Sequence, residues 1–394
     1  MATMRAAQFA RYQQEIFRAG TAGNRPPFPL EPEALVESAR RQMGPGPFAY
    51  VEGPASSGAT MRANREAFDQ WRIVPRMLTG STVRYLETTV LGTPMPAPLL
   101  AAPVGVQSIV HPDGELATAR ACAALGVPMV LSTMSSYSIE AVAEANGAGP
   151  RWFQLYRPND DELTASLLER ARLAGFTVLV VTLDTMSLAW RPAIVDQAYL
   201  PMLRGVGNAV LFSDPVFRAG LAKPPEQDLA AAVARWDELL GNAGQRWPDL
   251  RLLRDRWPGP IILKGIQHPD DARQAVAHGM DGVVVSNHGG RQVDGAIGAL
   301  DALPGIVDAV GGEAAVLYDS GVRTGADVFK ALALGAEAVL VGRPYAYGLG
   351  HAGESGVRHV LRGLLADFEL TVGLAGHTRV ADLDRGSLRE HRPQ

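Results

Sequence analysis

The sequence predicts one α/β domain, a single parallel (β/α)8 TIM barrel with an N-terminal helical extension and a long insertion after the fourth strand. Eight short apolar runs recur between residues 99 and 342, and stretches with helical spacing separate them. This alternation is typical of a closed parallel barrel. The chain has 394 residues, whereas a barrel alone needs about 250, so the surplus length needs its own explanation.

The eight runs consist mostly of β-branched and aliphatic residues, which is the pattern of strands buried on both faces. They occupy residues 99–103, 128–132, 152–156, 178–184, 260–264, 282–287, 315–319 and 338–342. Between them lie segments rich in Ala, Leu, Glu and Arg, and several of these end in glycine, a common helix terminator. We therefore expect strands and helices to alternate from residue 97 to about residue 350.

The surplus length falls in three places. Residues 1–96 form an N-terminal extension, in which Pro- and Gly-rich segments at 23–29 and 44–48 exclude long regular elements. Residues 186–258 form an insertion after the fourth run, and such an insertion lies over the face where barrel enzymes bind their substrates. We interpret it as a lid within a barrel domain, 97–394, that ends in a C-terminal helical tail.

Composition and charge exclude several classes of protein. The chain is 47% apolar and 20% charged, as a globular protein with a large core should be. Its 37 Lys and Arg and 41 Asp and Glu give a net charge of −4, without the basic excess that nucleic-acid binding requires. The single cysteine, Cys122, cannot form an internal disulfide. With no apolar run of membrane-spanning length and no signal core, we expect a cytoplasmic protein.

Polar side chains stand at or just after the end of each predicted strand from the second onward. These ends meet at one mouth of a barrel, where such enzymes place their catalytic residues. No metal-ligand spacing and no G-x-S-x-G elbow is present, and no G-x-G-x-x-G opens a helix directly after a predicted strand. We therefore predict no metal site, serine hydrolase or Rossmann site. The polar residues are Ser132, Gln154, Tyr156, Thr182, Asp184, Lys264, Ser286, His288, Arg291, Asp319 and Arg343.

The loops after the last two strands predict a phosphate site. Residues 320–325 read SGVRTG and residues 342–344 read GRP, so each loop combines glycine with an arginine. Barrels bind phosphate at this position through backbone N–H groups and a positive side chain. We therefore expect a ligand that carries a phosphate.

His288 is the strongest candidate for a general base, because glycines beside it allow a ligand to approach closely. Asp184, on another strand, is placed to orient the imidazole and to support its protonated form. Arg291 and Arg191 offer forked donors to an anionic substrate. For Lys264 three roles stay open: a Schiff-base nucleophile, a phosphate ligand or a cation beside a cofactor ring.

The segment SNHGGRQVDG at residues 286–295 resembles the active-site motif of the FMN-dependent α-hydroxy-acid oxidising enzymes, which include glycolate oxidase and mandelate dehydrogenase. Other blocks resemble the family in the same order: APVGVQSIVHPDGELATARA, FQLY, TLDT, LKGI, DSGVRTGADVFKALALGA and VGRP. The resemblance extends over residues 30–380. Within the family, RWFQLYRPND, WRP, LPMLRG, SDPVF and KGIQHPDDAR are most similar to lactate 2-monooxygenase.

The resemblance implies FMN as the cofactor and a role for each candidate residue. His288 would take a proton from the substrate with Asp184 as its partner, and Lys264 would lie at the N1/O2 edge of the flavin. Met134 occupies a position that shapes the substrate pocket. The implied substrate contacts are Tyr50, Tyr156, Arg191 and Arg291, and the implied FMN contacts are Pro103, Val104, Gly105, Ser132, Gln154, Thr182, Lys264, Ser286, Asp319, Gly321, Arg323, Gly342 and Arg343.

We therefore expect FMN-dependent oxidation of an L-2-hydroxy acid at Cα, with O2 as acceptor and oxidative decarboxylation as in lactate 2-monooxygenase. The resemblance also implies a homotetramer or larger. Alternatives within the family are an oxidase that releases a 2-oxo acid and H2O2, and a dehydrogenase; either would act on a different or bulkier acid. Outside it, a phosphate-binding barrel lyase or aldolase would use Lys264, and a non-catalytic FMN-holding protein would not need His288.

Overall fold

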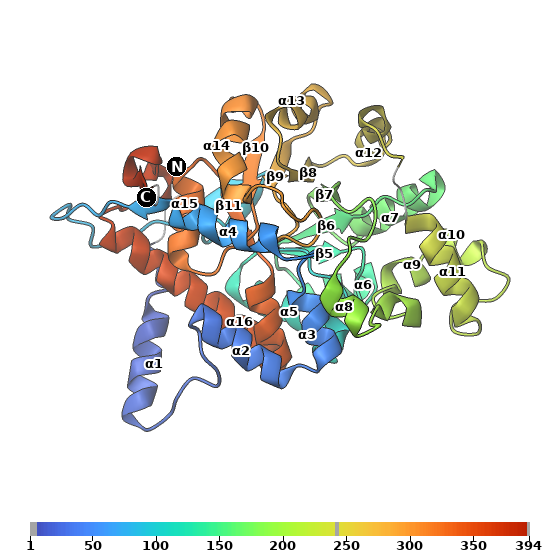
Figure 1. The fold of residues 1–394 in the computed structure, drawn as a ribbon, viewed down its shortest axis with the longest axis horizontal. Coiled ribbons are helices and arrows are strands. Elements are labelled where there is room, and N and C mark those ends of the chain that lie inside the picture. Colours follow the sequence, from blue (N-terminus) through green and yellow to red (C-terminus); the bar gives the residue numbers. More distant parts are fainter. Residues whose placement is uncertain (1–5, 241–243, 392–394) are drawn as a thin grey trace.

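The computed structural model describes residues 6–240 and 244–391. Eight strands form a closed barrel in the order β10-β11-β4-β5-β6-β7-β8-β9, and all neighbours are parallel (Figure 1). The strands are β4 (Leu99–Ala101), β5 (Met129–Ser132), β6 (Arg151–Leu155), β7 (Leu179–Thr182), β8 (Ile261–Ile266), β9 (Gly282–Val285), β10 (Ala315–Tyr318) and β11 (Ala338–Val341). Each overlaps one of the predicted runs, and the predicted TIM-barrel class is confirmed.

Both faces of the strands are buried, which explains why their sequences are apolar without interruption. One set of residues, including Val130, Val180 and Ile262, packs inside the barrel. The alternate set, including Leu131 and Val181, packs in a second cluster with residues of the surrounding helices. The barrel interior is therefore filled by side chains.

A short hairpin closes the end of the barrel at which the strands begin. Its two strands, β2 (Thr88–Val90) and β3 (Thr93–Met95), pair antiparallel just before β4. Val90 and Met95 join the interior cluster, and the indole N–H of Trp152 donates to Thr93 Oγ1 over 2.9 Å. With this end covered, a ligand reaches the barrel at the opposite end, where the strands terminate.

Helices surround the barrel, and the last is the longest. They are α5 (Gly114–Leu125), α6 (Ile139–Asn146), α7 (Asp161–Leu173), α13 (Pro269–Ala277), α14 (Ala299–Val310), α15 (Gly325–Ala333) and α16 (Arg343–Leu374). The backbone of α16 leaves helical geometry at Ala352 and Gly353, and the helix packs against α5 and α15. Beyond α16 the chain returns as β12 (Leu388–Glu390), which pairs antiparallel with β1 (Trp71–Ile73).

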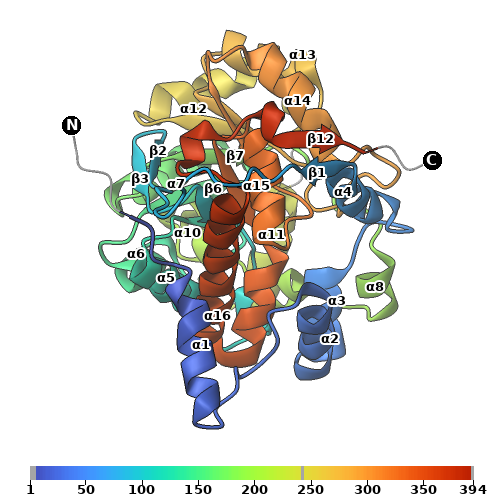
Figure 2. The ribbon, with the colours of Figure 1, turned by 90° about the vertical axis from the view of Figure 1, so that its left-hand side faces the viewer.

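The N-terminal residues form four helices on the outside of the barrel: α1 (Arg11–Thr21), α2 (Pro32–Gln42), α3 (Pro45–Glu52) and α4 (Ala59–Asp69). Prolines near the first position of α2 and α3 define where these helices begin. Helices α1, α2 and α3 contact α16, and α4 contacts α14 (Figure 2). This arrangement brings α3, which carries Tyr50, to the open end of the barrel.

The insertion between β7 and β8 contributes short helices and one longer one. They are α8 (Pro192–Asp196), the 3-10 helix η2 (Pro201–Arg204), α9 (Ala209–Phe212), α10 (Pro215–Ala219), α11 (Leu229–Leu240), the 3-10 helix η3 (Trp247–Asp249) and α12 (Leu250–Arg256). Helix α8 contacts α3 and lies beside it in Figure 1, whereas α9, α10 and α11 lie towards the right of that view. The predicted insertion, 186–258, also contains residues 241–243, which lie outside the described residues.

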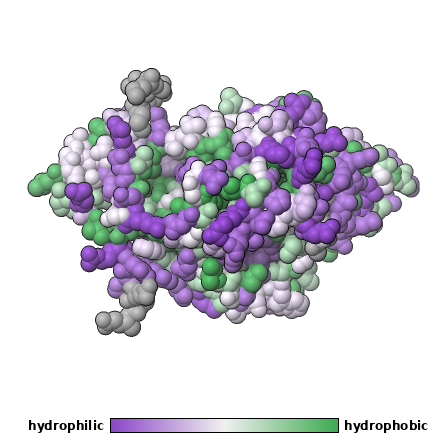
Figure 3. Space-filling model, turned by 90° about the horizontal axis from the view of Figure 1, so that it is seen from above, coloured by the Kyte–Doolittle hydropathy of each residue, from purple (hydrophilic) through white to green (hydrophobic). Residues whose placement is uncertain are grey.

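The surface mixes residue types. On the face that Figure 3 shows, hydrophobic residues lie in small groups separated by hydrophilic ones. Among the described residues, no helix combines the length and the hydropathy needed to cross a bilayer.

Candidate active site

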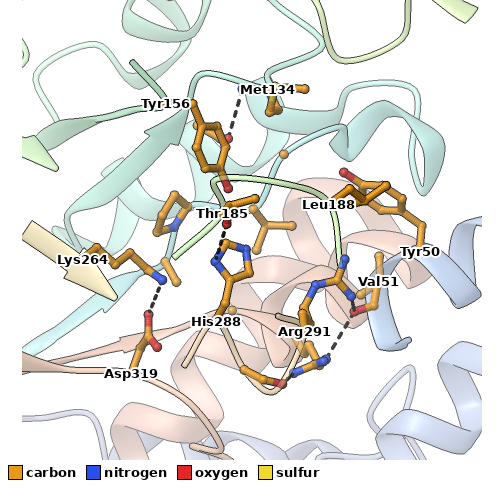
Figure 4. A pocket seen from close by; sticks show the side chains of 18 of the residues that line it. Tyr50, Val51, Met134, Tyr156, Thr185, Leu188, Lys264, His288, Arg291 and Asp319 are labelled. Atoms are coloured by element: carbon orange, nitrogen blue, oxygen red, sulfur yellow. Dashed lines mark hydrogen bonds and ion pairs between the residues drawn. The ribbon is translucent and has the colours of Figure 1, made fainter. Parts of the chain in front are cut away.

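A cavity of about 370 Å³ lies at the open end of the barrel. Figure 4 shows that its side chains come from strand ends, from α3 and from the loop that enters the insertion. All the candidate residues predicted from the sequence line this cavity except Gln154, Thr182, Asp184 and Ser286. The chain thus brings together residues that lie as far apart in sequence as Tyr50 and Arg343.

The four remaining candidates lie immediately behind the lining. Gln154 Oε1 accepts a hydrogen bond from Ser132 Oγ over 3.1 Å, and Ser286 Oγ accepts one from Lys264 Nζ over 3.0 Å. Asp184 Oδ1 lies 2.7 Å from His288 Nδ1. Thr182 is the register partner of Lys264 in the β7–β8 pair.

His288 and Asp184 form the centre of the site. Because Nδ1 of the imidazole donates to the Asp184 carboxylate, Nε2 is the nitrogen left for a ligand. Thr185 Oγ1 donates to the same carboxylate oxygen over 3.0 Å. It also lies 3.3 Å from Nδ1 of His288 (Figure 4). His288 has a φ of 56°, a left-handed conformation that is costly for a residue with a side chain. The fold therefore holds this imidazole in one orientation.

The electrostatics of this pair suit a base. Burial lowers the pKa of His288 below its ordinary 6.5, although the Asp184 carboxylate opposes the shift. Burial alone would raise the pKa of Asp184. The charge of Lys264, and the charge that His288 carries once it is protonated at acid pH, outweigh this effect and bring the pKa of Asp184 to about 2. At neutral pH an uncharged imidazole therefore lies beside an ionised carboxylate that stabilises any proton it accepts.

Four buried or half-buried arginines line the cavity: Arg191, Arg291, Arg323 and Arg343. Burial, together with the charges of Arg191 and Arg343, holds the pKa of Arg291 well below its ordinary value. Within residues 6–240 and 244–391, Arg291 has no carboxylate partner, and its Nη1 donates only to the carbonyls of Val51 and Gly53 at 3.1 and 2.9 Å. This excess of positive charge predicts an anionic ligand.

Two tyrosines complete the wall near the arginines. Tyr50 lies on α3, and the Arg291 guanidinium sits 5.7 Å from the centre of its ring. Tyr156 follows β6 directly. Burial raises the pKa of Tyr50, and burial with the Asp184 charge raises that of Tyr156 to about 12. Both hydroxyls therefore remain protonated and able to donate hydrogen bonds.

Lys264 is held as a cation. Its Nζ lies 3.1 Å from Asp319 Oδ2 (Figure 4). It also donates to Ser286 Oγ over 3.0 Å. Burial works against the charge, but the carboxylates of Asp319 and Asp184 raise the pKa of Lys264 above its ordinary value. A Schiff-base nucleophile requires a neutral amine, so this environment favours the role of a cation beside a cofactor ring.

The cavity fits a flat ring with a polar edge. Gln154 Nε2 and Thr182 Oγ1 are buried without a hydrogen-bond partner among the described residues, and such orphaned groups need a ligand that pairs with them. At Gly105 a Cβ would lie 2.7 Å from Met134 Cβ, so only glycine leaves that wall flat.

The part of the cavity formed by the loops after β10 and β11 fits a phosphate group. Gly321 and Gly342 line the cavity beside Arg323 and Arg343, and burial lowers the pKa of Arg323. The Arg323 side chain donates only to the carbonyl of Val322, over 2.9 Å, among the hydrogen bonds of the described residues. Donors and charge thus remain for a phosphate group.

A model of the family described as "FMN-dependent dehydrogenase" matches residues 39–390. The chain belongs to this family. It is therefore an FMN-dependent 2-hydroxy-acid oxidoreductase, and the residues described above are the ones that would hold the cofactor.

Other family members are similar along nearly their whole length. An FMN-dependent alpha-hydroxy acid dehydrogenase, qulF, of Penicillium citrinum is 51% identical over 97% of this chain and 96% of that protein. An L-lactate oxidase of Lysinibacillus sphaericus is 42% identical over 91% and 92%. The crystal structure of a mandelate oxidase, 37% identical, superposes with a TM-score of 0.79 over 90% of this chain and 96% of that one.

Several residues of the cavity region escaped the sequence analysis, and three of them are Thr185, Gln292 and Trp236. Thr185 and Gln292 directly follow predicted residues, and their polar side chains were the available signal. Trp236 lies on α11 and lines the cavity. Its position depends on the path of the insertion, which no spacing in the sequence indicates.

We expect the substitution Arg323→Met to weaken FMN binding about 10- to 100-fold, because it removes a charged donor from the part of the cavity that fits a phosphate group. Arg323 is a better probe than Arg343, which also donates to backbone carbonyls of Val51 and Gly289. Fluorescence titration of the apoprotein with FMN measures the change. Arg218→Met, at an exposed ion pair with Glu226, is the control, and an unchanged Kd in Arg323→Met would contradict the assignment.

Proposed function

We propose that this enzyme oxidises an L-2-hydroxy acid with a bulky apolar side chain at Cα and passes the electrons to O2. The observation that carries the proposal is the convergence of the His288–Asp184 pair and the unpaired Arg291 on one cavity. A base and a carboxylate site within one small space are what such a substrate requires.

In this proposal each side chain has a separate task. Arg291 and Arg191 bind the substrate carboxylate, and Tyr156 donates a hydrogen bond to it or to the hydroxyl. His288 Nε2 takes a proton from the substrate, and Asp184 stabilises the resulting imidazolium. When bound, FMN accepts the two electrons that leave Cα.

The proposed substrate class rests on the apolar residues of the cavity. Met134, Leu188, Leu200, Met202 and Trp236 are among its lining residues. Methionine side chains adapt to apolar groups of different shape. A branched aliphatic or aromatic substituent would bury its surface here, whereas the hydrogen atom of glycolate would leave the space unfilled.

A decarboxylating outcome, as in lactate 2-monooxygenase, is the second candidate. It requires the 2-oxo acid to stay in the site while oxygen reacts. The insertion favours retention because Trp236 and Leu240 of α11 line the cavity together with Leu188, and a covered site slows the escape of a product.

A panel of L-2-hydroxy acids tests both candidates when O2 uptake, H2O2, 2-oxo acid and CO2 are measured together under air. Faster turnover of L-3-phenyllactate and L-2-hydroxyisocaproate than of glycolate supports the proposed class. H2O2 with 2-oxo acid supports an oxidase, and CO2 without H2O2 supports decarboxylation. Reduction of the flavin without O2 uptake would contradict the proposed acceptor and indicate a dehydrogenase.

We expect kcat/KM to fall at acid pH with an apparent pKa below 6.5, because burial lowers the pKa of His288 and only the neutral imidazole accepts a proton. Activity is therefore retained from neutral pH downward until that pKa is reached. The pH profile of kcat/KM measures it. Since the Asp184 carboxylate raises the pKa of His288, Asp184→Asn should move the acid limb to lower pH. An apparent pKa above 6.5 for the acid limb of the wild-type profile would contradict this assignment.

A further inference from the structure

Gln292 uses its whole side-chain amide to join three segments of the site. Its Nε2 donates to the carbonyl oxygens of Asp184 and Ser187 over 2.7 and 3.0 Å. Its Oε1 accepts a hydrogen bond from Arg191 Nη2 over 2.6 Å. Two donors and one acceptor are thus satisfied by groups that lie more than 100 residues away along the chain.

The bond to Arg191 fixes one edge of its guanidinium. Nε of Arg191 donates to the carbonyl of Arg291 over 2.8 Å, and Nη2 donates to Gln292. Arg191 is only 5% exposed and lines the cavity, and within the described residues no carboxylate pairs with it. Because Nε and Nη2 share one edge of the planar group, the donors of the other edge remain for a ligand.

The bonds to Asp184 and Ser187 hold the loop that follows β7. This loop carries the Asp184 carboxylate that orients His288, and it also supplies Thr185 and Leu188 to the cavity wall. One side chain therefore ties the segment that orients the base to the arginine at the entry of the insertion.

We propose that Gln292 is a positioning residue that controls substrate-carboxylate binding by selecting the edge of Arg191 that faces the cavity. This inference rests on the proposed function, in which Arg191 binds that carboxylate. Gln292 itself is not required to touch the substrate, and its influence passes through Arg191 and the Asp184–Leu188 loop.

Oxalate binding to the FMN-loaded full-length enzyme tests the inference without turnover, because oxalate carries carboxylates but no oxidisable Cα hydrogen. The flavin absorbance change on titration gives the Kd. We expect Gln292→Met, which keeps the length of the side chain, to weaken oxalate binding about 10- to 100-fold, the value of a hydrogen bond to a charged group. Gln267→Met is the matched control, since Gln267 is half-buried and does not line the cavity. Among the described residues its amide donates only to the carbonyl of Ile297.

A double-mutant cycle with Arg191→Met separates positioning from a general structural effect. If Gln292 acts through Arg191, Gln292→Met adds little to the loss caused by Arg191→Met alone. In turnover, KM should rise more than kcat falls. The inference is wrong if the double variant raises the Kd for oxalate by the product of the two single-variant factors. It is also wrong if Gln292→Met binds oxalate as the wild type does.

If Gln292→Met does not fold, Gln292→Glu provides a second test. The glutamate carboxylate still accepts a hydrogen bond from Arg191, but its negative charge offsets the positive charge of that arginine. It also cannot donate to the carbonyl oxygens of Asp184 and Ser187. Oxalate binding should therefore again be weaker. Wild-type binding in this variant would overturn the inference. Failure of the wild-type enzyme to oxidise any hydroxy acid would instead overturn the proposed function, and oxalate titration distinguishes the two results.

Discussion

Replacing His288 with asparagine is expected to reduce kcat about 10²- to 10⁴-fold, the usual contribution of a positioned general base. Asparagine can donate a hydrogen bond towards Asp184, but it cannot accept a proton at neutral pH. The carboxylate site and the cofactor contacts should persist, so the variant should still bind FMN and oxalate. The rate at which substrate reduces the flavin, measured by stopped-flow absorbance without O2, gives the effect directly.

His278→Asn is the matched control for this prediction, because His278 is a half-buried residue at the end of α13 that does not line the cavity. Its ring lies beside that of Trp247, and among the described residues its Nδ1 contacts only the Gln274 carbonyl. Its turnover should equal that of the wild type. Unchanged turnover in His288→Asn would show that His288 is not the general base. The protein would then bind FMN without using this imidazole.

The substitution Arg291→Met is expected to lower kcat/KM about 10²- to 10³-fold, because it leaves the substrate carboxylate without its buried partner. The same change should not destabilise the apoprotein. Arg291 has no carboxylate partner in the described residues, and Arg191 and Arg343 repel it. Steady-state kinetics and the thermal unfolding midpoint of the apoprotein measure the two effects.

The pair of measurements distinguishes binding from structure. If Arg291 binds substrate, its substitution lowers activity and leaves the Tm of the apoprotein equal or higher, because an unpaired buried charge is removed. If Arg291→Met instead lowers the Tm and leaves kcat/KM unchanged, Arg291 serves the fold. Arg218→Met, at an exposed ion pair, should change neither quantity.

The barrel was predictable because local sequence determines it. Strands such as β7 and β9 are buried on both faces and therefore consist almost entirely of apolar residues. Their carboxyl ends meet at one mouth, so polar residues such as Lys264 and His288 were expected to lie together, and they line one cavity.

Features that depend on distant contacts were not predictable. Strand β12 forms because residues near the C-terminus meet β1, and neither segment of three residues has a pattern of its own. Trp236 reaches the cavity only through the path of α8 to α11. The role inferred for Gln292 needs the positions of Asp184, Ser187 and Arg191, which come from other segments.

Anaerobic reduction of the bound flavin by an L-2-hydroxy acid tests the central claim most directly. The FMN-loaded enzyme is mixed with L-3-phenyllactate in the absence of O2, and the flavin absorbance is followed in the wild type and in His288→Asn. Rapid bleaching in the wild type, with one 2-oxo acid formed per flavin and much slower bleaching in His288→Asn, is the predicted result. A flavin that stays oxidised with every acid of the panel would contradict the proposed oxidation at Cα.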